Sequence, residues 1–307
     1  MKSASSNITL CPSCGGSSYF VGSIPPTDIF AGRILLEPLN GGSLYRCKVC
    51  QLGFRWPRLS KTELDLLYED GSDHAWSSSV HLRRDWSVAH KWITSTLSKG
   101  DSILDIGCFD GGALESLVGN YKCFGVEIHP KARLLAEQKG ISLIGSDFSD
   151  LKGNFGFITA FDVIEHVEDP ALFLRKCLNA LRPGGYLLIS TGNFDSFTFR
   201  MMGSRYWYCT IAEHISFVSP RWFLKHFSEM GCKCEKLITF AHDEASIGRR
   251  IKEIFMNALY WIHPSIIGAL RRFGLGKKNI AKHPILAETP PGWISASDHF
   301  MVLLRKL

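Results

Sequence analysis

The chain has 307 residues, of which 45% are hydrophobic and 21% charged, and its formal net charge at pH 7 is +6. These values suit one large α/β domain with a small additional module, and they exclude a disordered or fibrous chain. The mild basic surplus fits an anionic substrate or surface but lacks the dense basic patch typical of nucleic-acid binders. The sequence shows no secretory signal or membrane span, so we expect a cytoplasmic protein.

The first predicted element is a β-rich module over residues 8–57. It contains two C-x-x-C pairs, which begin at Cys11 and Cys47. Each pair fits a knuckle that places two thiolates on one metal, and two knuckles complete a closed tetrahedral site. Four free or redox-active thiols are the alternative. We expect a structural Zn²⁺ held by Cys11, Cys14, Cys47 and Cys50.

Residues 58–100 are predicted to form a helical linker or lid. The segments 61–68 and 81–97 place apolar side chains at helical spacing, and the polar stretch 68–79 separates them. This segment would connect the module to the main domain.

From residue 101 to 307, short apolar runs alternate with helical stretches. The predicted strands are 103–106, 123–126, 141–144, 157–160 and 186–189, and two later strands cover Cys232–Phe240 and His299–Leu304. Prolines at the starts of 130–139 and 170–181 mark two of the helices between them. The pattern predicts an α/β, Rossmann-like, doubly wound and mostly parallel seven-stranded sheet, preceded by a small zinc ribbon built on four cysteines.

A glycine-rich turn follows the first of these strands, over residues 107–112. Glycine lets the backbone approach a ligand closely, but dinucleotide binders, methyltransferases and purely structural turns all use such loops. Phe109 stands where a G-x-G-x-x-G loop has its second glycine, which argues against an NAD-dependent enzyme.

Acidic residues close the next three strands, at Glu127, Asp147 and Asp162. Because the ends of parallel strands lie side by side, these carboxylates should converge on one crevice. There Glu127 can accept hydrogen bonds from ribose hydroxyls and Asp147 can reach an adenine amino group. For any single carboxylate, capping a helix or turn is the alternative.

Five motifs occur in a characteristic order: LDIGCFDGG (104–112), GVEIHP (125–130), GSDF (145–148), FDVIEHVEDP (161–170) and LRPGGYLLIST (181–191). From Ser102 to about Leu307 the chain therefore resembles the class I S-adenosylmethionine-dependent methyltransferases. That family often has glycine where Phe109 stands. The resemblance implies S-adenosylmethionine as cofactor, with contacts from Asp105, Gly107, Cys108, Gly111, Glu127, Ile128, Asp147, Phe148, Phe161 and Asp162.

Residues 44–54, with the paired cysteines, resemble the zinc-binding leader in front of some sugar C- and O-methyltransferases. This second resemblance implies a module that walls the substrate pocket, a tyrosine, here Tyr68, carried into the cofactor site, and a nucleotide-linked or glycan sugar as acceptor. Two alternatives stay open. One is a methyltransferase for a quinone-type phenol or another metabolite, and the other is a non-catalytic cofactor-sensing protein whose ribbon recognises nucleic acid or a protein.

Methyl transfer to a hydroxyl or an acidic carbon benefits from a general base. The pair Glu213-His214 lies in an aromatic loop after the fifth strand, and related sugar methyltransferases keep a histidine in this loop. We predict that His214 is the catalytic base and that Glu213 orients it. His166, in the fourth motif, is expected to pack near a helix start.

Residues 245–295 form a connection longer than usual and should contain helices of their own. Within 247–278, apolar side chains fall near helical spacing, with basic residues at both ends. We favour a helical lid or a dimer contact that covers the pocket. Peripheral contact with an anionic membrane is the alternative.

Overall fold

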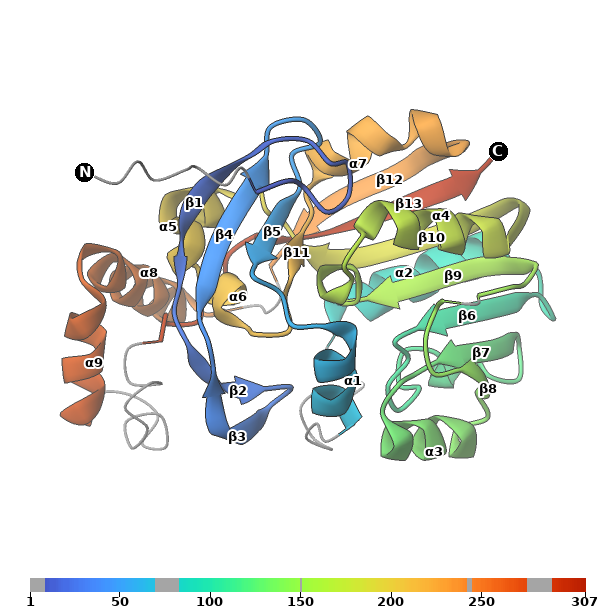
Figure 1. Ribbon diagram of the computed structural model, residues 1–307. Coiled ribbons are helices and arrows are strands. Elements are labelled where there is room, and N and C mark those ends of the chain that lie inside the picture. Colours follow the sequence, from blue (N-terminus) through green and yellow to red (C-terminus); the bar gives the residue numbers. More distant parts are fainter. Residues whose placement is uncertain (1–8, 70–82, 150, 242–244, 275–288) are drawn as a thin grey trace.

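The computed structural model describes residues 9–69, 83–149, 151–241, 245–274 and 289–307 (Figure 1). Most of the predicted linker 68–79, the start of the predicted helix 81–97, and residues 275–288 of the predicted insertion lie outside the described residues. The main sheet has seven strands in the order β12-β13-β10-β9-β6-β7-β8. Their bounds are β6 Ser102–Ile106, β7 Lys122–Val126, β8 Ser142–Gly145, β9 Phe155–Phe161, β10 Leu181–Gly192, β12 Cys232–Phe240 and β13 His299–Lys306.

The strands from β8 to β10 pair in parallel, whereas β13 is antiparallel to both of its neighbours. The prediction of a Rossmann-like, mostly parallel, seven-stranded sheet is therefore confirmed. One local difference concerns the glycine-rich turn. It leads into a 3-10 helix of three residues, Glu115–Leu117, and not into a longer helix.

Helices cover both faces of this sheet. Along β13, Phe300 and Val302 point into a core shared with α4 (Pro170–Ala180) and α7 (Pro220–His226). Met301 and Leu303, which alternate with them, point into the opposite core, shared with α2 (Arg84–Thr96) and α3 (Pro130–Gln138). This two-residue alternation is what a strand buried on both faces requires.

The N-terminal residues form a smaller antiparallel sheet, seen to the left of the main sheet in Figure 1. Its strands are β1 (Ser18–Ile24), β4 (Gly42–Cys47), β5 (Gly53–Trp56) and β11 (Ser216–Phe217), and a hairpin of β2 (Thr27–Phe30) and β3 (Arg33–Leu39) extends from it. Strand β11 comes from the chain after β10 and pairs Ser216 with Phe54. The predicted module 8–57 therefore shares both a sheet and a buried core with the later part of the chain.

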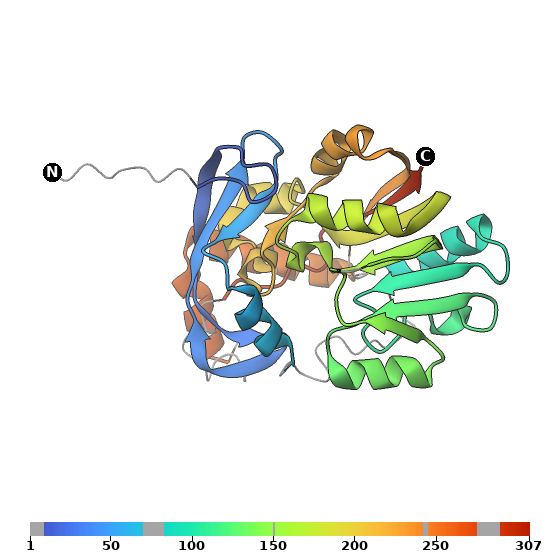
Figure 2. The same cartoon turned by 45° about the vertical axis from the view of Figure 1, so that its right-hand side comes forward.

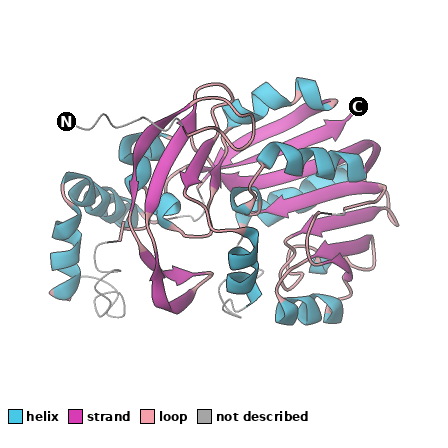
Figure 3. Cartoon of the chain, viewed as in Figure 1, coloured by secondary structure: helices cyan, strands magenta, loops and turns pink. Residues whose placement is uncertain are grey.

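The remaining helices lie around the N-terminal sheet (Figures 1 and 3). They are α1 (Lys61–Glu69), α5 (Phe197–Met202), α6 (Trp207–Thr210), α8 (Ile247–Ile262) and α9 (Pro264–Arg272). In both views of Figures 1 and 2, α8 and α9 lie beside this sheet, at the end of the molecule away from β7 and β8. Among the described residues, no helix is long and apolar enough to span a bilayer.

Candidate functional site

A cavity of about 460 Å³ opens at the carboxyl ends of β6, β7, β8 and β9. This volume falls within the range of small-molecule sites. Most of the side chains predicted to bind a cofactor line it: Tyr68, Asp105, Gly107, Cys108, Glu127, Ile128, Asp147, Phe148, Phe161 and Asp162. Parallel strand order thus brings together residues that lie far apart in the sequence.

Gly111 is the predicted cofactor residue that does not line the cavity. A Cβ there would lie 2.9 Å from Ile141 Cδ1 and 3.2 Å from Ala136 Cα, and its φ is +78°. Gly111 therefore lets the loop pack against α3. Gly107 does face the cavity, with φ +71°, and a Cβ there would meet Val163 at 2.7 Å. Both positions favour glycine for backbone conformation as well as for space.

Phe109, where the loop departs from the family pattern, also adopts a left-handed backbone with φ +45°. This conformation costs a non-glycine residue about 1 kcal/mol. Its N–H donates to Glu127 Oε2 at 2.8 Å, and the N–H of His129 donates to Glu127 Oε1 at 2.7 Å. The carboxylate of Glu127 thereby holds two backbone segments around the cavity, and burial raises its pKa.

Asp105 is almost fully buried at the end of β6. The hydroxyl of Thr159, its neighbour across the parallel pair β6–β9, donates to Asp105 Oδ1 at 2.7 Å. Burial raises the pKa of Asp105 to about 7. Thr159 carries no recognisable signal in the sequence, because only the pairing of β6 with β9 places it beside Asp105.

Arg83, at the start of α2, is a second residue that the sequence analysis missed. Its guanidinium contacts Asp85 at 2.6 Å and Asp162 at 2.7 Å, and lies 5.1 Å from the ring centre of Trp86. Asp162 has φ +53°, and its N–H donates to the carbonyl of Ser190. Arg83 and Trp86 line the cavity and add a cation and an aromatic surface to its acidic wall.

Two histidines lie next to each other beside the cavity, with ring centres 5.0 Å apart. His166 Nδ1 lies 2.9 Å from the Tyr68 hydroxyl and 3.1 Å from the carbonyl of Glu213, and His214 Nδ1 lies 2.9 Å from the carbonyl of Tyr208. A carbonyl only accepts, so the contact with Tyr208 assigns the proton of neutral His214 to Nδ1. At His166 the carbonyl of Glu213 favours the same tautomer, in which the Tyr68 hydroxyl is a second acceptor and Nε2 keeps its lone pair. Burial lowers the pKa of His166 and lowers that of His214 further.

Glu165 lies close to both histidines and is buried. The Tyr208 hydroxyl donates to one of its oxygens at 2.6 Å and the Thr191 hydroxyl to the other at 2.9 Å. Burial, followed by the nearby charge of Asp162, raises the pKa of Glu165 to about 7. Donor atoms of Glu165, His166 and His214 lie within 4.8 Å of one another, which makes these three groups candidate ligands of a second metal ion. Hydroxyl groups already donate to both oxygens of Glu165, so the three residues form a hydrogen-bonded network.

The predicted catalytic residues Glu213 and His214 lie beside His166. His166 lines the cavity. His214 is buried next to His166 and is not among the described residues that line the cavity. The carboxylate of Glu213, expected to orient His214, instead accepts the N–H of Ala31 at 2.9 Å. The carbonyl of Tyr208 fixes the ring of His214 in its place.

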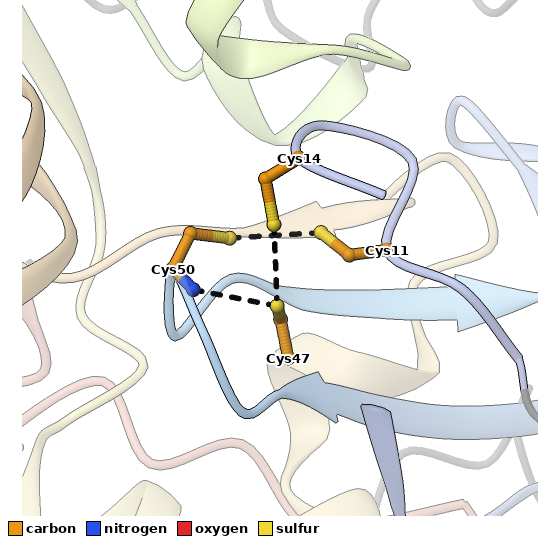
Figure 4. Close-up of side chains that lie close together, drawn as sticks. All are labelled: Cys11, Cys14, Cys47 and Cys50. Atoms are coloured by element: carbon orange, nitrogen blue, oxygen red, sulfur yellow. Dashed lines mark hydrogen bonds between the residues drawn. The ribbon is translucent and has the colours of Figure 1, made fainter. Parts of the chain in front are cut away.

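The four paired cysteines converge at one point (Figure 4). Sulfur–sulfur distances are 3.6 Å for Cys11–Cys50 and 3.5 Å for Cys14–Cys47. Tetrahedral zinc with Zn–S bonds of about 2.3 Å separates its sulfurs by about 3.8 Å. The N–H groups of Val49 and Cys50 donate to Cys47 Sγ and hold this sulfur in place, as outer hydrogen bonds do for metal ligands. The donor set therefore fits a structural zinc ion, as the sequence predicted.

This geometry defines a Rossmann-like fold with a small-molecule cavity at the carboxyl ends of its parallel strands. A family model described as a methyltransferase domain matches residues 81–237, about half of the chain. The chain belongs to this methyltransferase domain family. Its fold is similar to a chain in the solved complex of the Haloferax volcanii Trm112 methyltransferase activator with a methyltransferase. The TM-score is 0.51 and the identity 16%, over 80% of this chain and 97% of that one.

Curated relatives include ubiquinone biosynthesis O-methyltransferases. The protein of Bordetella bronchiseptica is 30% identical over 130 residues, which cover 38% of this chain and 54% of the relative. The protein of Vibrio vulnificus is 26% identical over 211 residues, which cover 60% of this chain and 89% of the relative. The chain thus spans about half the length of the first of these relatives.

Proposed function

We propose that the protein transfers a methyl group from S-adenosylmethionine to a small-molecule acceptor. The observation that carries this proposal is the convergence of Asp105, Glu127 and Asp147 on one cavity at the carboxyl ends of β6, β7 and β8. The glycine loop beside them and the family membership support the same cofactor. When bound, the sulfonium group supplies an electrophilic methyl, and the protein's task is to align an acceptor with it.

The acceptor that we favour is a phenolic hydroxyl of quinone type. The relatives named ubiquinone biosynthesis O-methyltransferases support it over the sugar acceptor expected from the N-terminal leader. A sugar is the second candidate, because α1, which follows the cysteine module, contributes Leu64 and Tyr68 to the cavity wall. A leader that walls the pocket is what the resemblance to sugar methyltransferases implies.

We assign to Nε2 of His166 the role of the general base, which takes the proton from the hydroxyl of the methyl acceptor. This histidine faces the cavity, its Nδ1–H is held by the Glu213 carbonyl, and burial keeps it neutral by lowering its pKa. Tyr68 lies next to it, with its hydroxyl 2.9 Å from Nδ1. His214, the base expected from the sequence, would then position His166 from behind.

For the cysteine cluster, we propose a structural Zn²⁺ on Cys11, Cys14, Cys47 and Cys50. Four thiolates fill the tetrahedral shell and leave no position for substrate, so the ion would stabilise the fold and take no part in catalysis. Metal analysis of protein purified without chelator should find one zinc ion per chain. Protein without zinc at these residues would contradict the assignment.

Calorimetry with S-adenosylhomocysteine tests the cofactor. We expect one site per chain, and an absence of binding would overturn the proposed methyl transfer. Labelled S-adenosylmethionine should then be offered with catechol-type phenols and, in parallel, with nucleotide-linked sugars. Label in the phenol supports the favoured acceptor, and label in a sugar selects the second candidate.

A further inference from the structure

Helix α8 has two apolar faces on opposite sides. Its inner face places Met256, Leu259 and Tyr260 against a buried cluster that also contains Tyr206 and Trp293. Its outer face is a stripe of exposed apolar side chains: Ile247, Ile251, Ile254, Phe255, Ala258, Trp261 and Ile262. At about 100° per residue these positions fall on one side of the helix.

The large side chains of this outer stripe range from 53% exposed at Ile254 to 78% at Ile247. Single exposed apolar residues are ordinary, but a contiguous stripe marks a surface for interaction. The stripe does not cover the cavity, since no described residue of α8 or α9 lines it. The expectation that this segment is a lid over the pocket is therefore not supported.

The charges of α8 are distributed asymmetrically. All residues of α8 are described, and they include the basic Arg249, Arg250 and Lys252 but a single acidic residue, Glu253. The Glu253 carboxylate is only 11% exposed, accepts the N–H of Ser295 at 3.1 Å and pairs with Arg249 at 3.2 Å. By helical spacing, Arg250 and Lys252 flank the outer stripe on its two sides. The outer face is thus apolar along its centre and basic along its edges.

We propose that α8 lies in the surface of a membrane that contains anionic lipids. The outer stripe would enter the boundary between headgroups and acyl chains, and the flanking cations would contact the headgroups. Trp261, near the end of the stripe, suits the interfacial zone. A second copy of the chain would bring two basic faces together, whereas anionic headgroups neutralise the charge. The proposal does not depend on the methyl-transfer activity.

Vesicle flotation tests the proposal with the full chain. We expect the protein to float with vesicles of equal parts phosphatidylcholine and phosphatidylglycerol, and much less with phosphatidylcholine alone. Phe255→Ser removes a 60% exposed ring and should lower the partition coefficient onto the mixed vesicles about tenfold. Leu36→Ser, at a fully exposed apolar side chain on β3, is the matched control and should float like the wild type.

Two further variants separate the contributions. Replacing both Arg250 and Lys252 with glutamine should weaken binding to the mixed vesicles and reduce its dependence on salt. Trp261→Phe should still float but lose part of the blue shift in tryptophan emission that anionic vesicles induce. Circular dichroism confirms that each variant is folded.

The proposal is overturned if the wild type stays unbound on the mixed vesicles, or if Phe255→Ser floats as well as the wild type. It is also overturned if sedimentation without lipid shows a dimer that Phe255→Ser dissociates, because the outer stripe would then be a contact between copies of the chain.

Discussion

The hydroxyl of Ser13 donates a hydrogen bond of 2.8 Å to the carboxylate of Asp169. Ser13 lies inside the first cysteine pair, and Asp169 caps α4 by accepting the N–H groups of Ala171 and Leu172. Asp169 also lines the cavity. This bond therefore connects the cysteine cluster to the wall of the cofactor cavity.

We predict that removal of the proposed Zn²⁺ weakens cofactor binding as well as stability. Cys14→Ser, or treatment with a strong chelator, should lower the melting temperature and reduce affinity for S-adenosylhomocysteine severalfold, because the start of α4 loses its support from the first knuckle. Calorimetry and thermal unfolding provide the measurements. Cys234→Ser, at a partly exposed thiol on β12, is the control, and an equal effect there would contradict the prediction.

Glu127→Gln should raise the dissociation constant for S-adenosylhomocysteine about 10- to 100-fold. The amide keeps one acceptor oxygen and carries no charge, so it cannot hold both backbone N–H donors and also accept from the cofactor's ribose hydroxyls. A lost hydrogen bond to a charged group costs about 1.5–3 kcal/mol. Titration calorimetry measures the change. Glu137→Gln, on the exposed side of α3, should bind like the wild type. An unchanged constant for Glu127→Gln would exclude this carboxylate from the site.

The two histidines should respond differently to substitution. His166→Ala should lower kcat by about 10² or more while it leaves S-adenosylhomocysteine binding largely intact, because the proton acceptor is lost. His214→Ala should have a smaller effect on kcat. His226→Ala, on α7, controls for the loss of an imidazole. If His214→Ala proves the more damaging change, the base is His214, as the aromatic loop first indicated.

The pH dependence gives an independent measure of the base. Burial lowers the pKa of both His166 and His214 below their ordinary value of 6.5. A base acts in its neutral form, so kcat/KM should contain an acidic limb below about pH 6.5 that His166→Ala lacks. Burial raises the pKa of Asp105 and Glu165 to about 7, and their titration should affect both proteins alike. The profile is measured with the acceptor identified in the label screen. A His166-dependent limb centred above about pH 6.5 would rule out a buried neutral histidine as the base.

Much of the α/β domain could be predicted because its signals are local. The apolar runs ending near Ile106 and Val126 fall on β6 and β7, and Cys232–Phe240 is β12 without adjustment. The carboxylates converge because parallel strand ends must share one edge, so their placement needed only the alternation of elements. The cluster of four cysteines could be predicted for the same reason, since each C-x-x-C pair defines its own knuckle.

The remaining features depend on contacts between distant parts of the chain. Nothing near Glu213 in the sequence reveals that its carboxylate is occupied by the N–H of Ala31. The role of Arg83 becomes visible only in the folded chain, where α2 lies against the loop that contains Asp162 and the two side chains form an ion pair. Which histidine faces the cavity depends on how the aromatic loop folds back, and its carbonyl at Tyr208 turns His214 inward.

Strand β11 also bears on how the protein is made. Its two residues complete the N-terminal sheet by pairing with β5, yet five of the seven strands of the main sheet lie between β5 and β11 in the chain. A ribosome therefore releases the first cysteine pairs long before their sheet can gain its last strand. Until β11 is synthesised, the edge of β5 in the nascent N-terminal segment stays unpaired. Early binding of a metal ion by the four thiolates would stabilise this segment during that time.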